Sequence, residues 1–586
     1  MIFGRAFFTT VFVSILLGAQ AYAAPNACNA AFAARNKAAL DRAHISRETN
    51  FERLKNEEFD VLVIGGGSAG LGTAVDAASR GLKVALVEAN DFAAETSSRS
   101  TKLLHGGVRY LEQLVMTFLK TLKFDKVMYN LIRDALHERN TALKLAPHLT
   151  RPLPIVTPIY KAHEVPYYWA GLKAYDALAG RSSRLPRSGF VDAATLKRDF
   201  PLMKQQGLKG GVLYYDGQFN DSRMAVALAM TAQEAGVAIV NHARVVGLTK
   251  SGDKLNGASV QDGLSGASAQ VRAKVVINAT GPFSDRIRRM DDPNVKPMIA
   301  AAAGTHIVLS KKFVPPSTGM LIPKTDDGRV LFVLPWEGHT LVGTTDARAD
   351  VKENPKATEA DIEYILGQVA KYYETKPTRE DVLSHWAGIR PLVSDPKSAD
   401  TAKLARDHVV QVSESNLLTV AGGKWTTYRK MALDVVDQAI RVAGLKPTKQ
   451  ESGTEDLVLI GGRNYSPDLA KKLEASTETD IAAHLAHNYG DRATEILELA
   501  RTENLGKRLA EAHPFLEAEV LYAIRAEGAR TTADIISRRI RLTFLEHAAT
   551  RQALDRVIDL AGNELNWSSE RRATERDSIL RDLATE

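Results

Sequence analysis

The sequence predicts an α/β fold in three parts: a domain on a parallel sheet, a domain on an antiparallel sheet, and a helical C-terminal domain. Three observations support this prediction. A strand, a glycine turn, a helix and a second strand follow one another within residues 61–88, strand-like runs recur through residues 305–346, and the chain becomes charged and helix-prone from about residue 455. Its 586 residues are enough for several domains and a large core.

The first element is the stretch VLVIGGGSAGLGTAVDAASRGLKVALVE at residues 61–88. Gly65, Gly67 and Gly70 fit G-x-G-x-x-G, in which the glycines allow a tight turn, close approach of the backbone to a pyrophosphate, and close helix packing. The following helix N-terminus offers free N–H groups to phosphates. Glu88 ends the second strand, where an acid accepts hydrogen bonds from the adenosine ribose. Together these features predict a Rossmann-like dinucleotide site.

The next segment favours FAD over NAD as that dinucleotide. Residues 96–110, TSSRSTKLLHGGVRY, form a dense run of hydroxyl side chains ending in basic residues. Hydroxyls and backbone amides here can contact a pyrophosphate and a ribityl chain. The candidate cofactor contacts in this run are Thr96, Ser97, Ser98, Ser100 and His105.

Two later turns add to the predicted cofactor site. The apolar strand in VVINATGPFSD stops at Ala279, Thr280 and Gly281, small residues that let the backbone approach the cofactor again. In TVAGGKWTTYRKMA, a glycine turn leads into a helix whose N-terminus can face the flavin pyrimidine, where negative charge gathers on reduction. The candidate contacts of this second turn are Gly422, Gly423, Lys424 and Thr426.

These segments resemble one family closely. Residues 64–81 meet the pattern IGGGxxGxGxAxDxxxRG, residues 422–432 meet GGKxxTYRxxA, and YYDGQFNDSRM, WAGIRPLVSDPKSADT and NELNW add to the likeness. From about residue 58 to about residue 575 the chain resembles FAD-linked glycerol-3-phosphate dehydrogenase of the mitochondrial type. The resemblance implies a glutathione-reductase-type, D-amino-acid-oxidase-like fold, non-covalent FAD, oxidation of sn-glycerol 3-phosphate to dihydroxyacetone phosphate, and ubiquinone as electron acceptor.

The resemblance also points to site residues. Arg109, Arg390 in AGIRPL, Arg406 and Lys424 are the expected ligands of the substrate phosphate, since a guanidinium fork suits that anion. His105 is the expected catalytic base, because the unperturbed pKa of histidine is near 6.5. Lys424 is the alternative base if cationic neighbours lower its pKa. Arg109, Arg390 and Lys424 are thus expected in the catalytic site together with His105.

Structural roles compete with these functional ones. His105 can be a histidine hydrogen-bonded beside the flavin, Arg109 can pair with an acid, and Arg406 can form a surface pair with Asp407. His306, on the strand-like run THIVLS, is expected in the core rather than in catalysis. The arginines of ISRRIRLTFL, at positions 538, 539 and 541, fit a solvated helix face, with a membrane-facing or dimer-facing helix as the alternative.

The spacing of the motifs predicts a discontinuous FAD domain, because its glycine turns lie at 65–70 and 422–423. Asn220 or Asp221 is the expected N-cap of the helix after YYDGQF. The predicted parts are an apolar targeting or anchor segment (1–24), a polar tether (25–57), the FAD domain (58–150, 206–300 and 401–450), the substrate domain (151–205 and 301–400) and the helical domain (455–586).

The N-terminal apolar run at residues 6–24 admits three interpretations: a secretory signal peptide, a mitochondrial targeting and anchoring segment, or a bacterial membrane anchor. The resemblance favours the second, at the mitochondrial inner membrane, with the bacterial cytoplasmic membrane as the alternative. The net charge of +7 suits a solvated basic surface or an anionic membrane surface. Nucleic acid is not an expected partner, since no recognition motif accompanies the charge.

Other expectations are negative or remain open. The single cysteine, Cys28, excludes an internal disulfide, and no EF-hand loop is present, so neither a calcium site nor another metal site is expected. A homodimer is compatible with the sequence. The rival functions are a glycerol-3-phosphate oxidase that uses O2, an amine or amino-acid oxidase of the same fold, and a flavin-binding scaffold without turnover. The several cations of the expected site argue against the amine and amino-acid oxidases.

Overall fold

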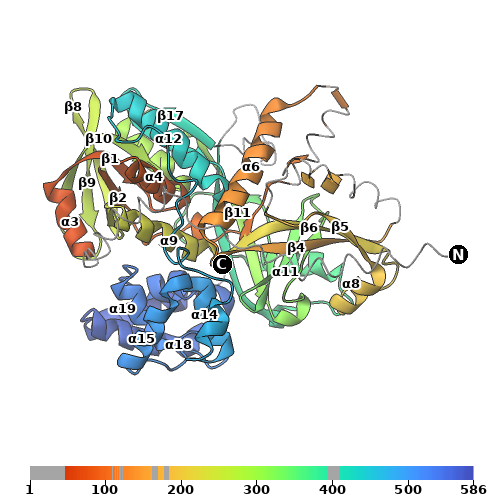
Figure 1. Cartoon of the computed structure of the whole chain (residues 1–586). Coiled ribbons are helices and arrows are strands. Elements are labelled where there is room, and N and C mark those ends of the chain that lie inside the picture. Colours follow the sequence, from red (N-terminus) through yellow and green to blue (C-terminus); the bar gives the residue numbers. More distant parts are fainter. Residues whose placement is uncertain are drawn as a thin grey trace. The chain divides into compact units, whose positions relative to one another are not determined.

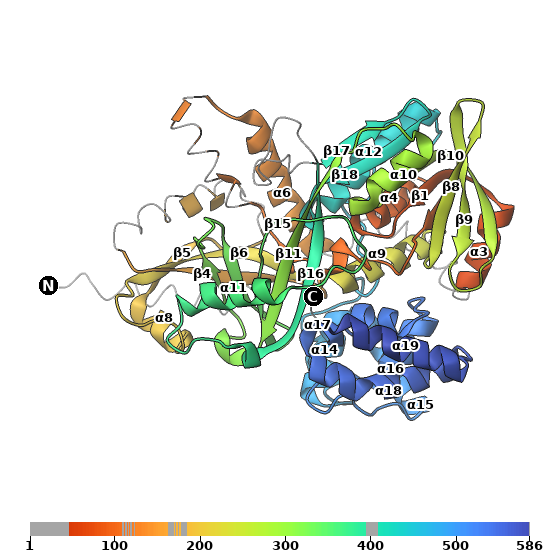
Figure 2. The ribbon, with the colours of Figure 1, turned by 180° about the vertical axis from the view of Figure 1, so that it is seen from behind.

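Two β-sheets and a set of C-terminal helices make up the protein. The computed structural model describes residues 46–584 except 108–109, 162–168, 179–183, 394–407 and scattered positions within 112–122 and 170–177. The apolar run at 6–24, Arg109 and Arg406 therefore lie outside the described residues. Figures 1 and 2 show the arrangement from opposite sides.

The first sheet holds the predicted dinucleotide fold. Its strand order is β17-β18-β10-β1-β2-β7, and every neighbouring pair from β18 to β7 is parallel. The strands are β1 (Glu58–Ile64), β2 (Val84–Val87), β7 (Ala238–Val240), β8 (Ala243–Ser251), β9 (Lys254–Asp262), β10 (Ser268–Asn278), β17 (His408–Val412) and β18 (Leu417–Gly422). Residues 61–64 are buried, as expected for the continuous apolar run of a central parallel strand.

Helices flank this sheet. They are α4 (Ser68–Ser79), α9 (Asp221–Glu234), α10 (Ser284–Asp291) and α12 (Tyr428–Ala443). Asn220 caps α9 by accepting a hydrogen bond from the Arg223 N–H at 3.3 Å, which confirms one of the two predicted caps.

The second sheet is largely antiparallel, with the order β15-β11-β14-β13-β12-β4-β6-β3. Its strands are β3 (Leu103–Leu104), β4 (Thr150–Ile159), β5 (Gly189–Asp192), β6 (Gly210–Phe219), β11 (Ile299–Leu309), β12 (Gly319–Ile322), β13 (Leu331–Trp336), β14 (His339–Gly343), β15 (Ala347–Arg348) and β16 (Val382–Val393). The helices α6 (Lys126–Leu145), α8 (Ala193–Asp199) and α11 (Glu359–Ala370) accompany it. The predicted FAD-domain segment 206–300 is wrong at its start, because β6 pairs with β4 along ten residues of this second sheet.

The C-terminal part is helical, as the charged sequence predicts, and is blue in Figure 1. Its helices are α13 (Leu469–Leu473), α14 (Thr479–Tyr489), α15 (Ala493–Thr502), α16 (Glu517–Arg525), α17 (Leu542–Leu545), α18 (His547–Glu564) and α19 (Ser569–Asp582). Their buried side chains join one core with those of the second sheet, including Trp336, Leu341 and Trp386. The helical part thus packs directly on the antiparallel sheet.

One predicted boundary needs correction near the N-terminus of the described chain. Residues 47–56, expected within a polar tether, form α3 (Arg47–Asn56). Phe51 and Leu54 lie one helical turn apart and are buried in the core of the first sheet. Arg47 pairs with the buried Asp262 at 2.7 Å. The low average hydropathy of this helix hides the two apolar side chains that dock it.

The arginine-rich segment also differs from both sequence interpretations. Arg539 and Arg541 are almost fully buried, whereas a solvated, membrane-facing or dimer-facing helix would expose them. Arg538 and Arg539 pair with Asp91, which follows β2, and Arg541 pairs with Asp221 at the start of α9. The segment therefore forms buried ion pairs that join the helical part to the first sheet and its helix α9. Among the described helices, none combines the length and the apolar character needed to cross a membrane.

Candidate active site

The predicted glycine turn lies between β1 and α4, at the carboxyl end of the parallel sheet. Gly65 adopts a φ of +110°, and a Cβ there would stand 2.6 Å from the carbonyl oxygen of Ala279. A Cβ on Gly70 would stand 1.9 Å from the carbonyl oxygen of Gly65. Glycine is therefore required at both positions, as the motif predicts.

Gly67 has a different surrounding. The nearest atom to a Cβ built on it would be Ser97 Oγ, 3.2 Å away. Gly67 is also the N-cap of α4, it supplies no capping side chain, and the first turn of α4 contains no acid. Because uncapped N–H groups and the helix dipole favour an anion, this end of α4 suits a pyrophosphate.

Glu88 is held beside the glycine turn. Its carboxylate accepts hydrogen bonds from the N–H of Gly66 at 2.6 Å and the N–H of Asn90 at 2.8 Å. Burial raises the pKa of Glu88, against the lowering effect of these two hydrogen bonds. The two hydrogen bonds fix the orientation of the carboxylate at the end of β2. Because the residue is still partly exposed, the carboxylate can accept a hydrogen bond from a further donor.

The turn after β10 adjoins the glycine turn. The Ala279 N–H donates to the Ile64 carbonyl at 2.8 Å, across the parallel pair of β10 and β1. Thr280 donates its hydroxyl to Asn278 at 2.7 Å, and Gly281 has a φ of +55°. The structure therefore brings Ala279, Thr280 and Gly281 to the same edge of the sheet as Gly65.

The hydroxyl run separates into two groups. Ser97 accepts a hydrogen bond from the Ser68 N–H at 3.0 Å and so borders the glycine turn, while Thr96 donates to the Ile389 carbonyl at 2.6 Å. Ser98 is buried and donates to Glu95, and Ser100 donates to Asp221 at 2.8 Å. The hydroxyls of Ser98 and Ser100 thus donate hydrogen bonds to other groups of the protein, whereas Ser97 stays a proposed cofactor contact.

The second glycine turn meets this run. Gly422 and Gly423 have φ values of +79° and +73°, which glycine adopts without strain. Trp425 donates its indole N–H to the Ser97 carbonyl at 2.7 Å, and the His105 N–H donates to the Thr426 hydroxyl at 3.2 Å. The candidate base is therefore held at the start of the helix that follows Lys424.

Lys424 and His105 have buried neighbours that set their positions. Lys424 Nζ lies 4.2 Å from the centroid of the Tyr110 ring, a cation–π contact. The N–H of Gly106 donates to the Tyr175 hydroxyl at 3.0 Å, and the same hydroxyl contacts Asp216. The sequence offered Asp216 only as part of a strand motif, because its partners come from distant elements.

Arg390 lies on β16 and faces the second sheet's loops. Its guanidinium donates to the Thr344 hydroxyl at 3.1 Å and to the Asp346 carboxylate at 3.3 Å. Asp346 also pairs with Arg329, and Arg390 keeps about a third of its side chain exposed. Thr344 and Asp346 escaped the sequence analysis, which recognised their segment only as a strand-like run. β16 meets the hydroxyl run through the Thr96 contact with Ile389.

A buried ionic network contacts the backbone of the hydroxyl run, residues 96–101. Lys102 Nζ donates to Asp221 at 2.7 Å and to the Ser98 carbonyl at 2.8 Å. Arg541 donates to the same Ser98 carbonyl at 2.8 Å. Burial lowers the pKa of Lys102 to about 7, against the opposing charge of Asp221. The sequence placed Asp221 only as a possible helix cap.

His306 lies in the core, as expected. Its Nε2 is 3.0 Å from the Thr101 hydroxyl, and its ring stacks on Trp386 at 5.3 Å between centroids. Burial, together with the charges of Lys102 and Arg390, lowers the pKa of His306 well below its usual value. A neutral, packed imidazole in this position supports the fold rather than proton transfer.

The residues present fit a flavin dinucleotide. The open N-terminus of α4 and the cramped glycine turn suit a pyrophosphate, and the Glu88 carboxylate suits a ribose. His105 lies after the hydroxyl run, Lys424 in the second glycine turn and Arg390 on β16, so the proposed titratable and cationic groups come from three separate segments. Such a set can hold an anionic alcohol and accept its hydroxyl proton.

Two family models match most of the chain. Residues 60–429 match the family model described as FAD dependent oxidoreductase, and residues 452–572 match the C-terminal domain of alpha-glycerophosphate oxidase. The mitochondrial glycerol-3-phosphate dehydrogenase of Mus musculus is 47% identical over 560 residues, covering 93% of this chain and 76% of that protein. The mitochondrial enzyme of Arabidopsis thaliana is 44% identical and covers 89% of this chain and 85% of its own length.

A solved structure agrees. The glycerol-3-phosphate dehydrogenase from Bacillus halodurans, complexed with FAD, superposes with a TM-score of 0.74 at 26% identity, over 92% of this chain and 97% of that one. The predicted fold class and FAD dependence are thereby confirmed. The chain belongs to the family of FAD-dependent glycerol-3-phosphate dehydrogenases, and the relatives that are 47% and 44% identical to it are mitochondrial members.

Proposed function

We propose that this protein oxidises sn-glycerol 3-phosphate to dihydroxyacetone phosphate. The observation that supports this most directly is the 47% identity, over 93% of the chain, to a mitochondrial glycerol-3-phosphate dehydrogenase. The site adds a chemical argument: a phosphate ester needs fixed cations, and Arg390 and Lys424 lie next to the segments that fit FAD.

The cofactor contacts proposed for this chain come from three parts of it. The N–H groups at the start of α4 and Ser97 face the pyrophosphate, Glu88 accepts from the ribose, and the turns at 279–281 and 422–424 approach the flavin. Bound there, FAD supplies the acceptor for a hydride from the secondary carbon of the substrate. The chain's own task is to bind, orient and deprotonate the alcohol.

Two residues compete for the proton of the substrate hydroxyl. A neutral His105 can take it directly, and the hydrogen bond from its backbone N–H to the Thr426 hydroxyl positions its backbone. Lys424 is the second candidate for this proton, and its Nζ lies 4.2 Å from the centroid of the Tyr110 ring. Arg390 binds the phosphate with its planar fork, held in orientation by Asp346 and Thr344. Arg109 and Arg406 are further proposed phosphate ligands.

The proposed electron acceptor is ubiquinone, and the proposed location is the mitochondrial inner membrane. The mitochondrial relatives and the apolar run at residues 6–24 support both. Oxygen is a specific rival, because the C-terminal part matches a domain described from alpha-glycerophosphate oxidase.

Anaerobic stopped-flow spectroscopy tests the substrate. Glycerol 3-phosphate should bleach the oxidised flavin absorbance, while glycerol at the same concentration should leave it almost unchanged. A flavin that stays oxidised with glycerol 3-phosphate would refute the proposed activity. Mixing the reduced enzyme with a soluble quinone analogue or with oxygen then identifies the acceptor, and rapid reoxidation by oxygen with release of hydrogen peroxide would favour the oxidase.

The membrane proposal has a separate test. Deleting residues 2–45 leaves α3 and the whole flavin domain in place. The truncated protein should be reduced by substrate at the rate of the full chain but should be lost from the membrane fraction. Full retention in that fraction would contradict an N-terminal attachment.

A further inference from the structure

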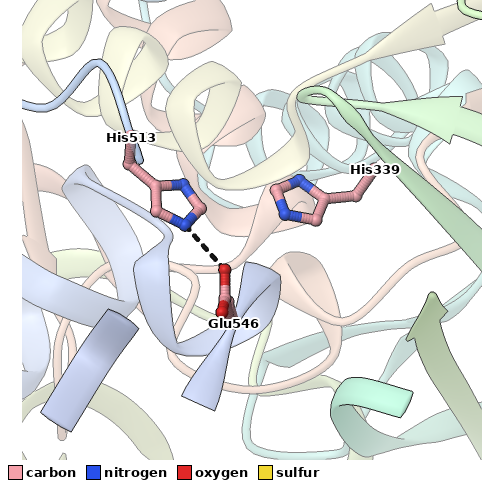
Figure 3. A group of neighbouring side chains, drawn as sticks. All are labelled: His339, His513 and Glu546. Atoms are coloured by element: carbon pink, nitrogen blue, oxygen red, sulfur yellow. Dashed lines mark hydrogen bonds and ion pairs between the residues drawn. The ribbon is translucent and has the colours of Figure 1, made fainter. Parts of the chain in front are cut away.

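Three side chains outside the flavin site converge at the junction of the second sheet and the helical part. His339 begins β14, His513 lies in the loop before α16, and Glu546 directly precedes α18. Each offers one metal-binding atom, and all three atoms lie within 4.8 Å of one another. His513 Nε2 and Glu546 Oε2 are 2.9 Å apart. Figure 3 shows the His339 ring turned toward the other two side chains.

His339 is prepared as a ligand. Its Nδ1 lies 2.8 Å from the carbonyl oxygen of Glu337, a group that can only accept, so Nδ1 holds the proton and donates it. The lone pair is therefore on Nε2. A backbone carbonyl that fixes the tautomer of an imidazole is the usual support of a metal-binding histidine.

The two imidazoles lie close together. The rings of His339 and His513 are nearly parallel, at 6°, with centroids 5.5 Å apart. The His513 ring also stacks on Phe515, with centroids 5.7 Å apart and an angle of 12°. Phe515 and the stacked rings keep His513 in one orientation, with only about 5% of its side chain exposed.

Glu546 departs from its expected local role. It occupies the N-cap of α18, where a side chain usually accepts a hydrogen bond from the first turn, but it makes no such bond. Its carboxylate points to His513 instead. About a quarter of the Glu546 side chain is exposed, which leaves one open side for a water molecule or an entering ion.

A second cluster of possible metal ligands differs because its carboxylates are already paired with arginines. Asp91, His242 and Asp534 also bring ligand atoms within 4.8 Å. There, however, Arg538 and Arg539 already neutralise the two carboxylates. In the part of the chain that the structure describes, Glu546 has no arginine or lysine within ion-pair distance. Among the described residues, the imidazole of His513 is its partner at such a distance.

We propose that His339, His513 and Glu546 form a binding site for a divalent transition-metal ion, with Zn²⁺ as the best match, that fastens the helical part to the antiparallel sheet. Two imidazole nitrogens and one carboxylate oxygen, at about 2.0–2.2 Å from the ion, are a common zinc ligand set, and water completes the tetrahedron. The donors have only to adjust to mutual separations of about 3.4 Å.

No sequence motif predicts this site, because its ligands are far apart along the chain. His339 comes from a hairpin of the second sheet, and the other two come from separate loops of the helical part. An ion here would cross-link two parts of the chain that are distant in sequence. It would act on stability and on the seating of the helical part, not on the oxidation chemistry.

Metal analysis of the FAD-containing full-length protein tests the proposal. The protein should be prepared without a polyhistidine tag, treated with EDTA and dialysed against Zn²⁺. We expect about one zinc per chain in the wild type and in the control His385→Ala, a partly buried histidine on strand β16 of the same sheet. His339→Ala and Glu546→Gln should each lower the zinc content at least tenfold.

Thermal unfolding adds a second measurement. Zn²⁺ should raise the melting temperature of the wild type and of His385→Ala, and should leave that of Glu546→Gln unchanged. Glu546→Gln conserves shape, so it separates lost binding from lost folding. Equal zinc content and equal stabilisation in the wild type and Glu546→Gln would overturn the site. Absence of bound zinc from the wild type after dialysis would overturn it as well.

Discussion

The guanidinium of Arg390 is oriented before any substrate arrives, because Asp346 and Thr344 hold two of its nitrogens. Arg390→Ala should raise KM for glycerol 3-phosphate about 30-fold or more, since losing a buried charged contact costs about 2–5 kcal/mol. Arg390→Lys should recover little, because an ammonium cannot reproduce the fork. Steady-state kinetics measure both, with Arg379→Lys, in an exposed ion pair, as the control. An unchanged KM in Arg390→Ala would remove this residue from the phosphate site.

If His105 is the catalytic base, the rate of flavin reduction should depend on pH. A base must be neutral to act, so flavin reduction should slow as the pH falls through the pKa of His105 in the complex. His105→Asn should slow reduction by about 10²–10⁴-fold and abolish this acid limb, with FAD content preserved. Stopped-flow reduction from pH 5 to 9 measures it, and His137→Asn, an exposed histidine, is the control. Wild-type rates in His105→Asn would transfer the role to Lys424.

Residue roles differ in how far the sequence predicts them. Gly65, Gly70 and Glu88 were predictable because the turn φ of Gly65, the contact of Gly70 with Gly65 and the hydrogen bond from Gly66 to Glu88 all arise within one strand-turn-helix-strand unit, where spacing fixes geometry. Asp221 and Asp346 were not predictable as site-supporting residues. Lys102, the buried partner of Asp221, is 119 positions away, and only the packed fold shows that they meet. Contacts within one local motif could be predicted from the sequence, whereas ion pairs between distant positions could not.

At the scale of elements, the start of α9 anchors two buried cations. Asp221 pairs with Lys102 and Arg541, and all three side chains are almost fully buried. Asp221→Asn would leave both cations without a carboxylate and should cost about 3–5 kcal/mol. Lys102→Met should cost less, because Asp221 then still has Arg541. Melting temperatures of the two variants compare these costs, and a larger loss in Lys102→Met would contradict the assignment.

Helix α3 is fastened by an acid-sensitive contact. Burial alone would raise the pKa of Asp262, but hydrogen bonds led by that from Arg47 outweigh it and lower the pKa to about 2. The folded pKa lies below the unfolded value, so this contact stabilises the protein above about pH 4, and the stabilisation is lost as the pH falls toward 2.

Arg47→Met tests that contact. At pH 7 the variant should show faster hydrogen exchange in residues 47–56 and a lower melting temperature than the wild type. The difference in melting temperature should shrink between pH 4 and pH 2, because the wild type then loses the same interaction. Arg53→Met, in a more exposed pair with Glu57, is the matched control. A difference that stays constant down to pH 2 would refute the role of Asp262.

The arginines at 538–541 show the limit of charge patterns at this scale. A run of basic and apolar residues predicts an amphipathic surface helix when its partners are unknown. Here Asp91 and Asp221, from two other elements, neutralise the segment inside the protein. By contrast, the alternation of strands and helices in the first sheet was predictable, since hydrophobic period and glycine turns are local properties.

At the scale of the whole molecule, the helical part contacts the proposed flavin-binding segments directly. Arg541 donates to the Ser98 carbonyl, and Ser97 next to it borders the glycine turn. Binding of FAD should therefore order the hydroxyl run and, through it, residues 534–545. We expect hydrogen exchange in that segment to rise at least severalfold in the apoprotein, while α15 changes little. Equal protection of residues 534–545 with and without FAD would show that the helical part is insensitive to the cofactor.

The strand order of the first sheet has a consequence for synthesis on the ribosome. β1 obtains its neighbour β2 almost at once, but its other neighbour, β10, ends at residue 278, and β18 completes the flavin edge only at residue 422. At about 5–20 residues per second, an apolar strand edge stays open for roughly 10–40 s until β10 has been translated. During that interval the nascent chain presents an unpaired, hydrophobic strand of the kind that chaperones bind and that other nascent chains can join. The discontinuous domain therefore makes the flavin-binding sheet depend on protection during translation, and slowing elongation between residues 64 and 278 should increase aggregation more than slowing it after residue 450.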